Sequence, residues 1–61
     1  MPKELLKDFM NKNCTITLMG EEHIQFTGTV ISVEGYWIKI KEEECIRVLN
    51  GAMIQDIKTN K

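Results

Sequence analysis

Apolar and polar residues alternate along most of this chain, with the period of two that is typical of half-buried β-strands. The pattern predicts five strands, at residues 14–19, 24–33, 36–41, 45–49 and 52–58. Gly28 interrupts the longest of them, and a glycine inside a strand often marks a bulge or a sharp bend. We therefore expect residues 24–41 to form a long, bent hairpin with which the shorter strands pair.

The second predicted strand is apolar on both faces. Ile24, Phe26 and Val30 share one face of it. Ile31 and Val33 fall on the opposite face, beyond the glycine. A strand with this pattern contacts apolar neighbours on two sides, which is possible if it bends around a small barrel.

The first residues of the chain have a helical period instead. Residues 2–12 place four apolar side chains on one side of a helix, namely Leu5, Leu6, Phe9 and Met10. Pro2 suits the first helical turn, where its missing N–H costs little, and residues 11–13 favour a turn at the end. We expect a short amphipathic helix that covers one end of the β core.

Three polar segments are predicted turns between the later strands. Glu34-Gly35 joins the second strand to the third, and Gly35 is free to adopt a positive φ. The acidic residues 42–44 form a solvated turn before the fourth strand. Asn50-Gly51 is the strongest two-residue turn signal in the chain and precedes the fifth strand.

The predicted elements define a mainly β fold in a single domain, residues 1–61. A short helix precedes a five-stranded, strongly bent, partly open barrel of the SH3-like kind. The end strands of such a barrel carry unpaired backbone groups, which favour pairing with another chain. The apolar members of the last strand are Met53, Ile54 and Ile57, and those of the fourth include Ile46 and Val48 on one face.

The length of the chain, its cysteines and its apolar runs indicate which class of protein it belongs to. A chain of 61 residues buries only about 60% of its unfolded surface, so we expect self-association to add stability. Two cysteines, Cys14 and Cys45, do not make a disulfide framework, and the N-terminus lacks the apolar segment of a signal peptide. No apolar run approaches the ~20 residues that span a bilayer. These features predict a cytoplasmic protein without a membrane segment.

No residue pattern indicates catalysis or a bound cofactor. The acidic residues cluster in predicted turns, away from the burial that tunes a general acid or base. His23 has no second histidine and no cysteine nearby in sequence, so we expect no metal site. The chain also lacks a phosphate-binding glycine loop and an HExxH motif. We therefore expect a protein that is not an enzyme.

Two groups of short motifs resemble a known family. The first contains Phe26-Thr27-Gly28-Thr29-Val30, Ser32-Val33-Glu34 and Tyr36-Trp37-Ile38-Lys39-Ile40-Lys41. The second contains Ile46-Arg47-Val48-Leu49, Asn50-Gly51 and Ala52-Met53-Ile54. Together with the N-terminal helix, these motifs resemble the Sm-like (LSm) family, most closely the pattern of the bacterial RNA chaperone Hfq. The resemblance spans nearly the whole chain and implies an Sm-like barrel.

The resemblance also implies a partner and a site. It implies a homo-oligomeric ring in which the fourth strand of one subunit pairs with the fifth strand of the next. Single-stranded, uridine-rich RNA would bind near the pore, at the turns that follow strands two and four. Tyr36 takes the position of an aromatic residue that stacks on a base. The expected RNA-binding residues are Tyr36, Trp37, Glu34, Asn50, Lys39 and Arg47.

Departures from the family pattern support an alternative function. Gly35 replaces a polar residue of the first turn, and Asn50-Gly51 lacks the cation of the second. Attraction to phosphate supplies much of the affinity of nucleic-acid binding. The alternative is therefore a protein-interaction or scaffold ring that has lost the RNA site. A monomeric SH3-like barrel is a third possibility.

The site residues themselves allow two interpretations. Tyr36 and Trp37 are adjacent on a strand, so at most one of them belongs to the core. Instead of stacking on bases, one ring would pack inside and the other would cover a subunit contact. Lys39, Lys41 and Arg47 form either a basic strip on neighbouring strands or surface pairs with residues 42–44.

Overall fold

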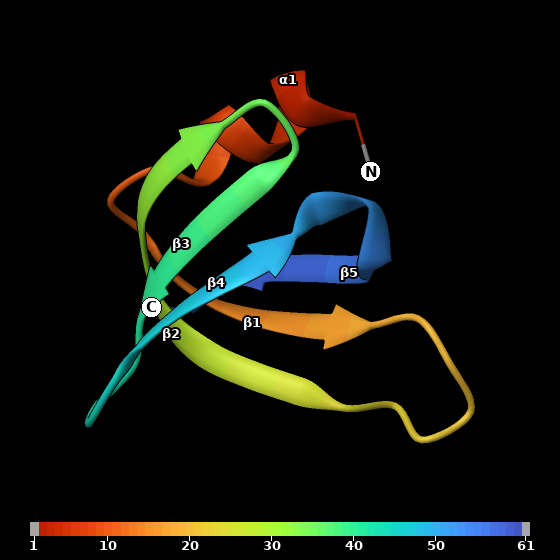
Figure 1. The fold of residues 1–61 in the computed structure, drawn as a ribbon. Coiled ribbons are helices and arrows are strands. Elements are labelled where there is room, and N and C mark those ends of the chain that lie inside the picture. Colours follow the sequence, from red (N-terminus) through yellow and green to blue (C-terminus); the bar gives the residue numbers. More distant parts are fainter. Residues whose placement is uncertain (1, 61) are drawn as a thin grey trace.

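The computed structural model describes residues 2–60, which form a short N-terminal helix and one antiparallel sheet (Figure 1). The elements in chain order are α1 (Lys3–Leu6), the 3-10 turn η1 (Lys7–Phe9), β1 (Asn13–Leu18), β2 (Gln25–Glu34), β3 (Trp37–Lys41), β4 (Ile46–Asn50), the 3-10 turn η2 (Gly51–Met53) and β5 (Ile54–Thr59). The mainly β fold with five strands is confirmed. Each strand begins and ends within two residues of its predicted bounds.

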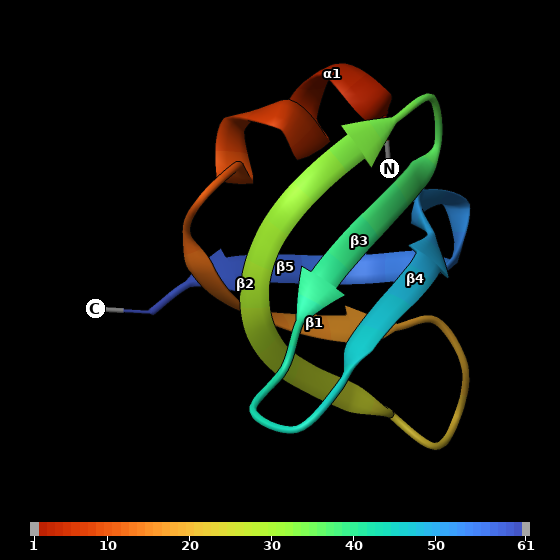
Figure 2. The same cartoon turned by 60° about the vertical axis from the view of Figure 1, so that its left-hand side comes forward.

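The strands lie in the order β4-β3-β2-β1-β5, so β4 and β5 are the two edges of the sheet. Strands β1 to β4 follow one another as antiparallel hairpins, whereas β5 pairs with β1. Figure 2 shows β2 curving along its length, so that β5 crosses behind β3. The sheet is strongly bent but not closed.

The core lies on the concave side of this sheet. Its buried apolar side chains come from α1 and all strands except β4: Leu6, Cys14, Ile16, Val30, Ile38, Ile40, Ile54 and Ile57. Partly buried residues pack against them, including Leu49 of β4. The alternation in β3 is strict, because Ile38 and Ile40 are buried and their neighbours are exposed. Burying each such side chain contributes roughly 1.5–3 kcal/mol.

The helix is shorter than predicted. Helical structure ends at Phe9 rather than near residue 12, and Met10 is already extended with ψ 134°. Asn11 has φ 63°, and its N–H donates to the Val30 carbonyl at 2.7 Å. Pairing with β2 therefore stabilises this segment more than three further residues of a marginal helix would. Of the four predicted apolar residues, Leu6 is buried and Leu5 is 50% exposed, so the prediction was wrong for Leu5.

The bend of β2 arises at two positions rather than one. The β2–β3 register shifts between Val30 and Ser32, so the bulge lies at Ile31 and not at Gly28. Gly28 instead allows a close approach. A Cβ at this position would lie 2.5 Å from Ile40 Cγ2 and 2.7 Å from the Lys41 carbonyl oxygen. The glycine thus lets Ile40 and the end of β3 lie close to the β2 backbone, and the extra residue of the bulge increases the local twist.

Several apolar residues predicted to lie in strands fall just outside them, among them Ile24 and Met53. Ile24 precedes β2 and is 47% exposed, and Met53 lies in η2 and is 53% exposed. Both belong to loops whose backbone is hydrogen-bonded to a neighbouring segment, Ile24 to Leu18 and Met53 to Met19. The backbone pairing fixes these loops while their side chains point to solvent.

Asn50-Gly51 does not form a two-residue hairpin. The Asn50 side chain accepts a hydrogen bond from the Ala52 N–H at 2.9 Å and begins the 3-10 turn η2. This turn carries the chain from the edge strand β4 to the opposite edge strand β5, and the two strands are not paired. A turn was therefore predicted correctly, but its type was wrong, because an Asn side chain can stabilise a 3-10 turn as well as a hairpin.

Candidate functional site

The tip of the β2–β3 hairpin exposes two aromatic rings. Glu34 of β2 faces Trp37 of β3 in the register, and Gly35 and Tyr36 form the two-residue loop between them. Gly35 has φ 59°, the positive value expected for this position. Tyr36 is 53% exposed and Trp37 is 55% exposed. The expectation that one ring packs into the core was therefore wrong.

The two predicted binding turns lie against each other. The N–H of Gly51, which begins η2, donates to the Tyr36 carbonyl at the hairpin tip. Asn50 is the register partner of Trp37 across β3 and β4. A Cβ at Gly51 would lie 2.6 Å from Leu6 Cδ1 and 2.8 Å from the Tyr36 carbonyl oxygen. The missing side chain at position 51 is thus what allows this close approach.

The outer face of β3 carries the exposed side chains of the site. Trp37, Lys39 and Lys41 alternate with the buried isoleucines and point away from the core. Their partners on β4 are Asn50, Val48 and Ile46. Val48 is 53% exposed and Ile46 is 60% exposed, so they share one face as predicted, and that face is the outer one.

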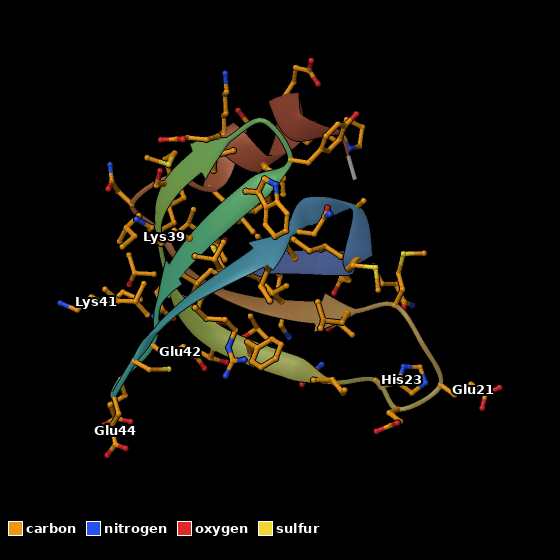
Figure 3. All side chains as sticks on the ribbon, in the orientation of Figure 1. Glu21, His23, Lys39, Lys41, Glu42 and Glu44 are labelled. Carbon is orange, nitrogen blue, oxygen red and sulfur yellow. The ribbon has the colours of Figure 1, made fainter. Side chains whose placement is uncertain are left out.

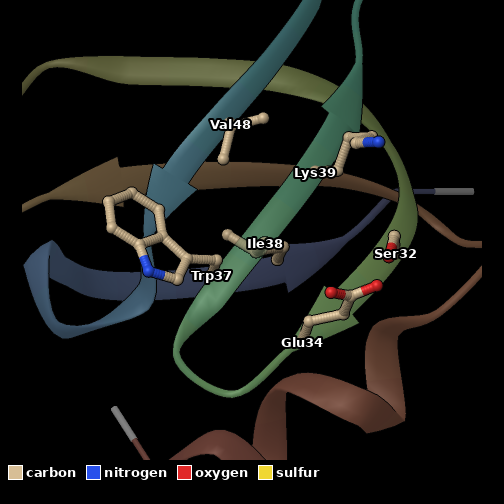
Figure 4. Close-up of a pocket in the computed structure, with 6 residues that line it drawn as sticks. All are labelled: Ser32, Glu34, Trp37, Ile38, Lys39 and Val48. Carbon is tan, nitrogen blue, oxygen red and sulfur yellow. The ribbon is translucent and has the colours of Figure 1, made fainter.

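A shallow depression of about 140 Å³ lies on this outer face (Figure 4). It is lined by Ser32, Glu34, Trp37, Ile38, Lys39 and Val48. In Figure 4, Trp37 and Val48 lie on one side of it, and Ser32 and Glu34 lie on the other. Sequence reasoning did not include Ser32 and Val48. Their positions in the strand alternation were the available signal, but the partner of each strand was not known.

Arg47 does not belong to this surface. It is the register partner of the buried Ile40, so it points to the opposite face of the sheet from Lys39 and Lys41. Its Nε donates to Glu42 Oε2 at 2.7 Å, and its guanidinium lies 4.0 Å from the centre of the Phe26 ring. The predicted strip of three cations is therefore wrong, and the pairing with the acidic turn is confirmed for Arg47.

The acidic turn is only partly solvated. The Glu42 side chain is 18% exposed, whereas its neighbours Glu43 and Glu44 are both exposed. Figure 3 shows Glu44 at the far end of the loop from Glu42. Hydrogen bonds from Arg47 and then from the Cys45 thiol lower the pKa of Glu42. The same contact, from Cys45 Sγ to Glu42 Oε2 at 3.2 Å, raises the pKa of the Cys45 thiol. This cluster fixes the β3–β4 connection.

The other cysteine, Cys14, lies in the core. Cys14 is fully buried in β1, and its Sγ donates to the Lys12 carbonyl at 3.4 Å. Burial raises the pKa of this thiol, and the nearby charge of Lys12 partly opposes the effect. The thiol form is therefore favoured, which suits a core residue.

His23 lies in the exposed β1–β2 loop with φ 52°. Within residues 2–60, no three His, Cys, Asp or Glu side chains are grouped closely enough to hold a metal ion. In the same part of the chain, no helix has the length and apolar character needed to cross a membrane.

Comparisons of the chain with protein-family models, with curated proteins and with solved structures find no match.

Proposed function

We propose that this chain is a ring-forming Sm-like subunit that binds single-stranded, uridine-rich RNA near the pore. The proposal rests mainly on the contact between Gly51 and Tyr36, which places the two turns expected to hold RNA next to each other. Tyr36 and Trp37 are both more than half exposed there, and an exposed ring is available for stacking on a base. The proposed role is non-enzymatic and cytoplasmic, with no cofactor.

The two edges of the sheet support the proposed ring. In the proposed assembly, the sheet is the wall of a partly open SH3-like barrel, and β4 of one subunit pairs with β5 of the next. Within residues 2–60, both edge strands have one side without a partner strand. Exposed Ile46 and Val48 on β4 add apolar surface beside that edge, which favours its coverage by another subunit.

The first test measures mass and RNA binding together. Light scattering of the purified protein should give a mass several times that of one chain. Fluorescence anisotropy at low salt should show binding of an oligouridine at micromolar protein. Failure to bind either oligouridine or oligoadenosine would contradict the RNA-binding part of the proposal.

A matched pair of variants localises the binding. Tyr36→Ala should weaken oligouridine binding by roughly tenfold, because stacking on one base contributes about 1–3 kcal/mol. Ile24→Ala removes a similarly exposed apolar side chain from the β1–β2 loop and should leave the affinity unchanged. Equal losses in the two variants would argue against a site at the hairpin tip.

A scaffold ring without an RNA site is the second candidate. The observation that favours it is the position of Arg47, whose charge is paired with Glu42 and directed away from the hairpin tip. No cation is present at Asn50-Gly51 to replace it. A ring that binds neither oligonucleotide would support this function, whereas a particle with the mass of one chain would support the monomeric barrel.

A further inference from the structure

The depression on the outer face of β3 combines an aromatic ring with a carboxylate. Glu34 and Trp37 are direct cross-strand partners, so their Cβ atoms lie about 5 Å apart on the same face. Both side chains are exposed. Among the side chains that the structure describes, Glu34 forms no ion pair, in contrast to Glu42. The carboxylate is therefore available to a ligand that contacts the indole.

The two sides of the depression differ in polarity. Trp37 and Val48 form an apolar side, and Glu34 and Ser32 present a carboxylate and a hydroxyl opposite them (Figure 4). A flat ligand that lies against the indole would turn one edge toward these oxygens. The edge has to carry hydrogen-bond donors, because an ionised carboxylate only accepts hydrogen bonds.

We propose that this depression binds a guanine base of single-stranded RNA, and thus gives the proposed RNA-binding function a base preference. Trp37 contacts the face of the base. The Glu34 carboxylate accepts two hydrogen bonds, one from the N1–H and one from the exocyclic N2 amino group. The inference rests on the proposed function and adds a second base to the one stacked on Tyr36.

The chemistry of the four bases separates guanine from the others. Guanine presents two adjacent donors on its Watson–Crick edge, which matches the two oxygens of one carboxylate. Uracil presents one donor between two carbonyl oxygens, and a carboxylate repels these oxygens. Adenine and cytosine each present one amino group next to a ring nitrogen acceptor, so only one favourable contact forms. Edges of unstacked bases are read in this way in single-stranded RNA.

The charges around the depression are compatible with RNA. Lys39 lines it, and Lys41 lies two residues further along the same exposed face of β3. These two ammonium groups can meet the phosphates that flank the bound base. Both lysines are exposed on the same face of β3 as Trp37, although the whole chain carries a net charge of −1.

The experiment compares three labelled pentanucleotides, UUGUU, UUUUU and UUAUU, by fluorescence anisotropy at low salt with the full chain. UUGUU should bind about tenfold more tightly than the other two, which is within the range for one bidentate contact to a base edge. Replacing its guanine with inosine, which lacks the N2 amino group, should remove most of this preference. Quenching of the fluorescence of Trp37, the only tryptophan, should accompany binding.

Two charge-matched variants test the role of Glu34. Glu34→Gln keeps the size of the side chain but no longer offers two acceptors, so the preference for UUGUU should disappear while UUUUU binding persists. Glu44→Gln makes the same change in charge in the β3–β4 loop, away from the depression (Figure 3), and should keep the preference. Circular dichroism of both variants confirms that they are folded.

The outcomes separate this inference from the proposed function. Equal binding of the three pentanucleotides would overturn the guanine preference and leave RNA binding intact. Binding of none of them would overturn both. Tighter binding of an arginine-rich peptide than of UUGUU, with Trp37 quenching, would assign the depression to a basic protein segment and would also overturn the inference.

Discussion

The two faces of β3 come from alternating residues of one five-residue strand, yet they have different environments. On the inner face, Ile38 and Ile40 are 0% exposed and belong to the core. On the outer face, Trp37 is 55% exposed, and two lysines are exposed beside it. The comparison shows how one strand of a small domain supplies both core residues and exposed side chains, because successive side chains point to opposite faces of the sheet.

The largest expected effect is the loss of stability caused by substituting a buried residue on the inner face of β3. Ile38→Ala should lower the free energy of unfolding by about 2–5 kcal/mol, because it removes buried methyl groups and leaves a cavity. That loss is comparable to the whole stability that a core of this size supplies, about 3–5 kcal/mol. Urea denaturation followed by circular dichroism measures it, and Ile38→Val should cost only about 0.5–1.5 kcal/mol.

The adjacent outer residue is the control for this loss. Trp37→Ala should change the free energy of unfolding by no more than about 0.5 kcal/mol, as expected for a surface substitution. It should nevertheless weaken oligonucleotide binding. A loss of stability from Trp37→Ala as large as that from Ile38→Ala would show that the outer face also contributes to folding.

The second effect concerns Gly28, where an added Cβ would meet Ile40 and the Lys41 carbonyl oxygen of β3. Gly28→Ala should destabilise the domain by about 1–3 kcal/mol, because the added Cβ overlaps both a core side chain and the β3 backbone. Thr27→Ala alters the exposed neighbouring position and serves as the control. An unchanged denaturation midpoint for Gly28→Ala would mean that β3 shifts away without cost.

The third effect is on the salt dependence of RNA binding and concerns only the outer face of β3. Lys39→Gln should reduce the salt dependence of RNA binding, with a change of about 0.7 in the slope of log K against log salt concentration for one lost phosphate contact. Lys58→Gln, on the edge strand β5, should leave the slope unchanged. Anisotropy titrations at several salt concentrations measure both, and equal slopes for Lys39→Gln and the wild type would remove Lys39 from the interface.

The smallest effect is a dependence of stability on pH. Because Arg47 lowers the pKa of folded Glu42, their pair stabilises the fold above the ordinary glutamate pKa of about 4.3. This contribution is lost as the pH falls through the lower pKa of the folded state. The difference in unfolding free energy between wild type and Glu42→Gln should thus be constant above about pH 5 and shrink below it.

Urea denaturation at a series of pH values between neutrality and acid measures that difference. Glu44→Gln serves as the control, because this residue is exposed at the tip of the same loop. The assignment to the Arg47 pair fails if the two variants show the same dependence on pH.

Much of the fold was predictable because local rules and the tertiary structure agreed. The period of two located every strand, and the buried Ile38 and Ile40 follow from it directly. The positive φ of Gly35 was predictable because a tight hairpin requires it. The position of the bulge was not predictable, because Gly28 and Ile31 are both compatible with one, and only the register with β3 assigns it to Ile31.

The candidate site was less predictable than the fold. Its aromatic residues were identified, since a Tyr-Trp pair at a predicted turn is conspicuous in the sequence. The direction of Arg47 was not, because it depends on which residue of β3 lies opposite it. The same reason explains why Val48 and Ser32 were missed: a depression requires residues from three strands, whose alignment is a long-range property.

The sequence by itself determined the number of strands, their bounds to within two residues and which side chains of β3 are buried. These features depend on residues that are close together in the chain, and the alternation of apolar and polar residues reports them directly. Only the tertiary structure decided that β4 and β5 are opposite edges, that the Gly51 N–H meets the Tyr36 carbonyl, and that Glu34 faces Trp37. Those relations depend on strand order and register, which are set by packing between residues far apart in the chain.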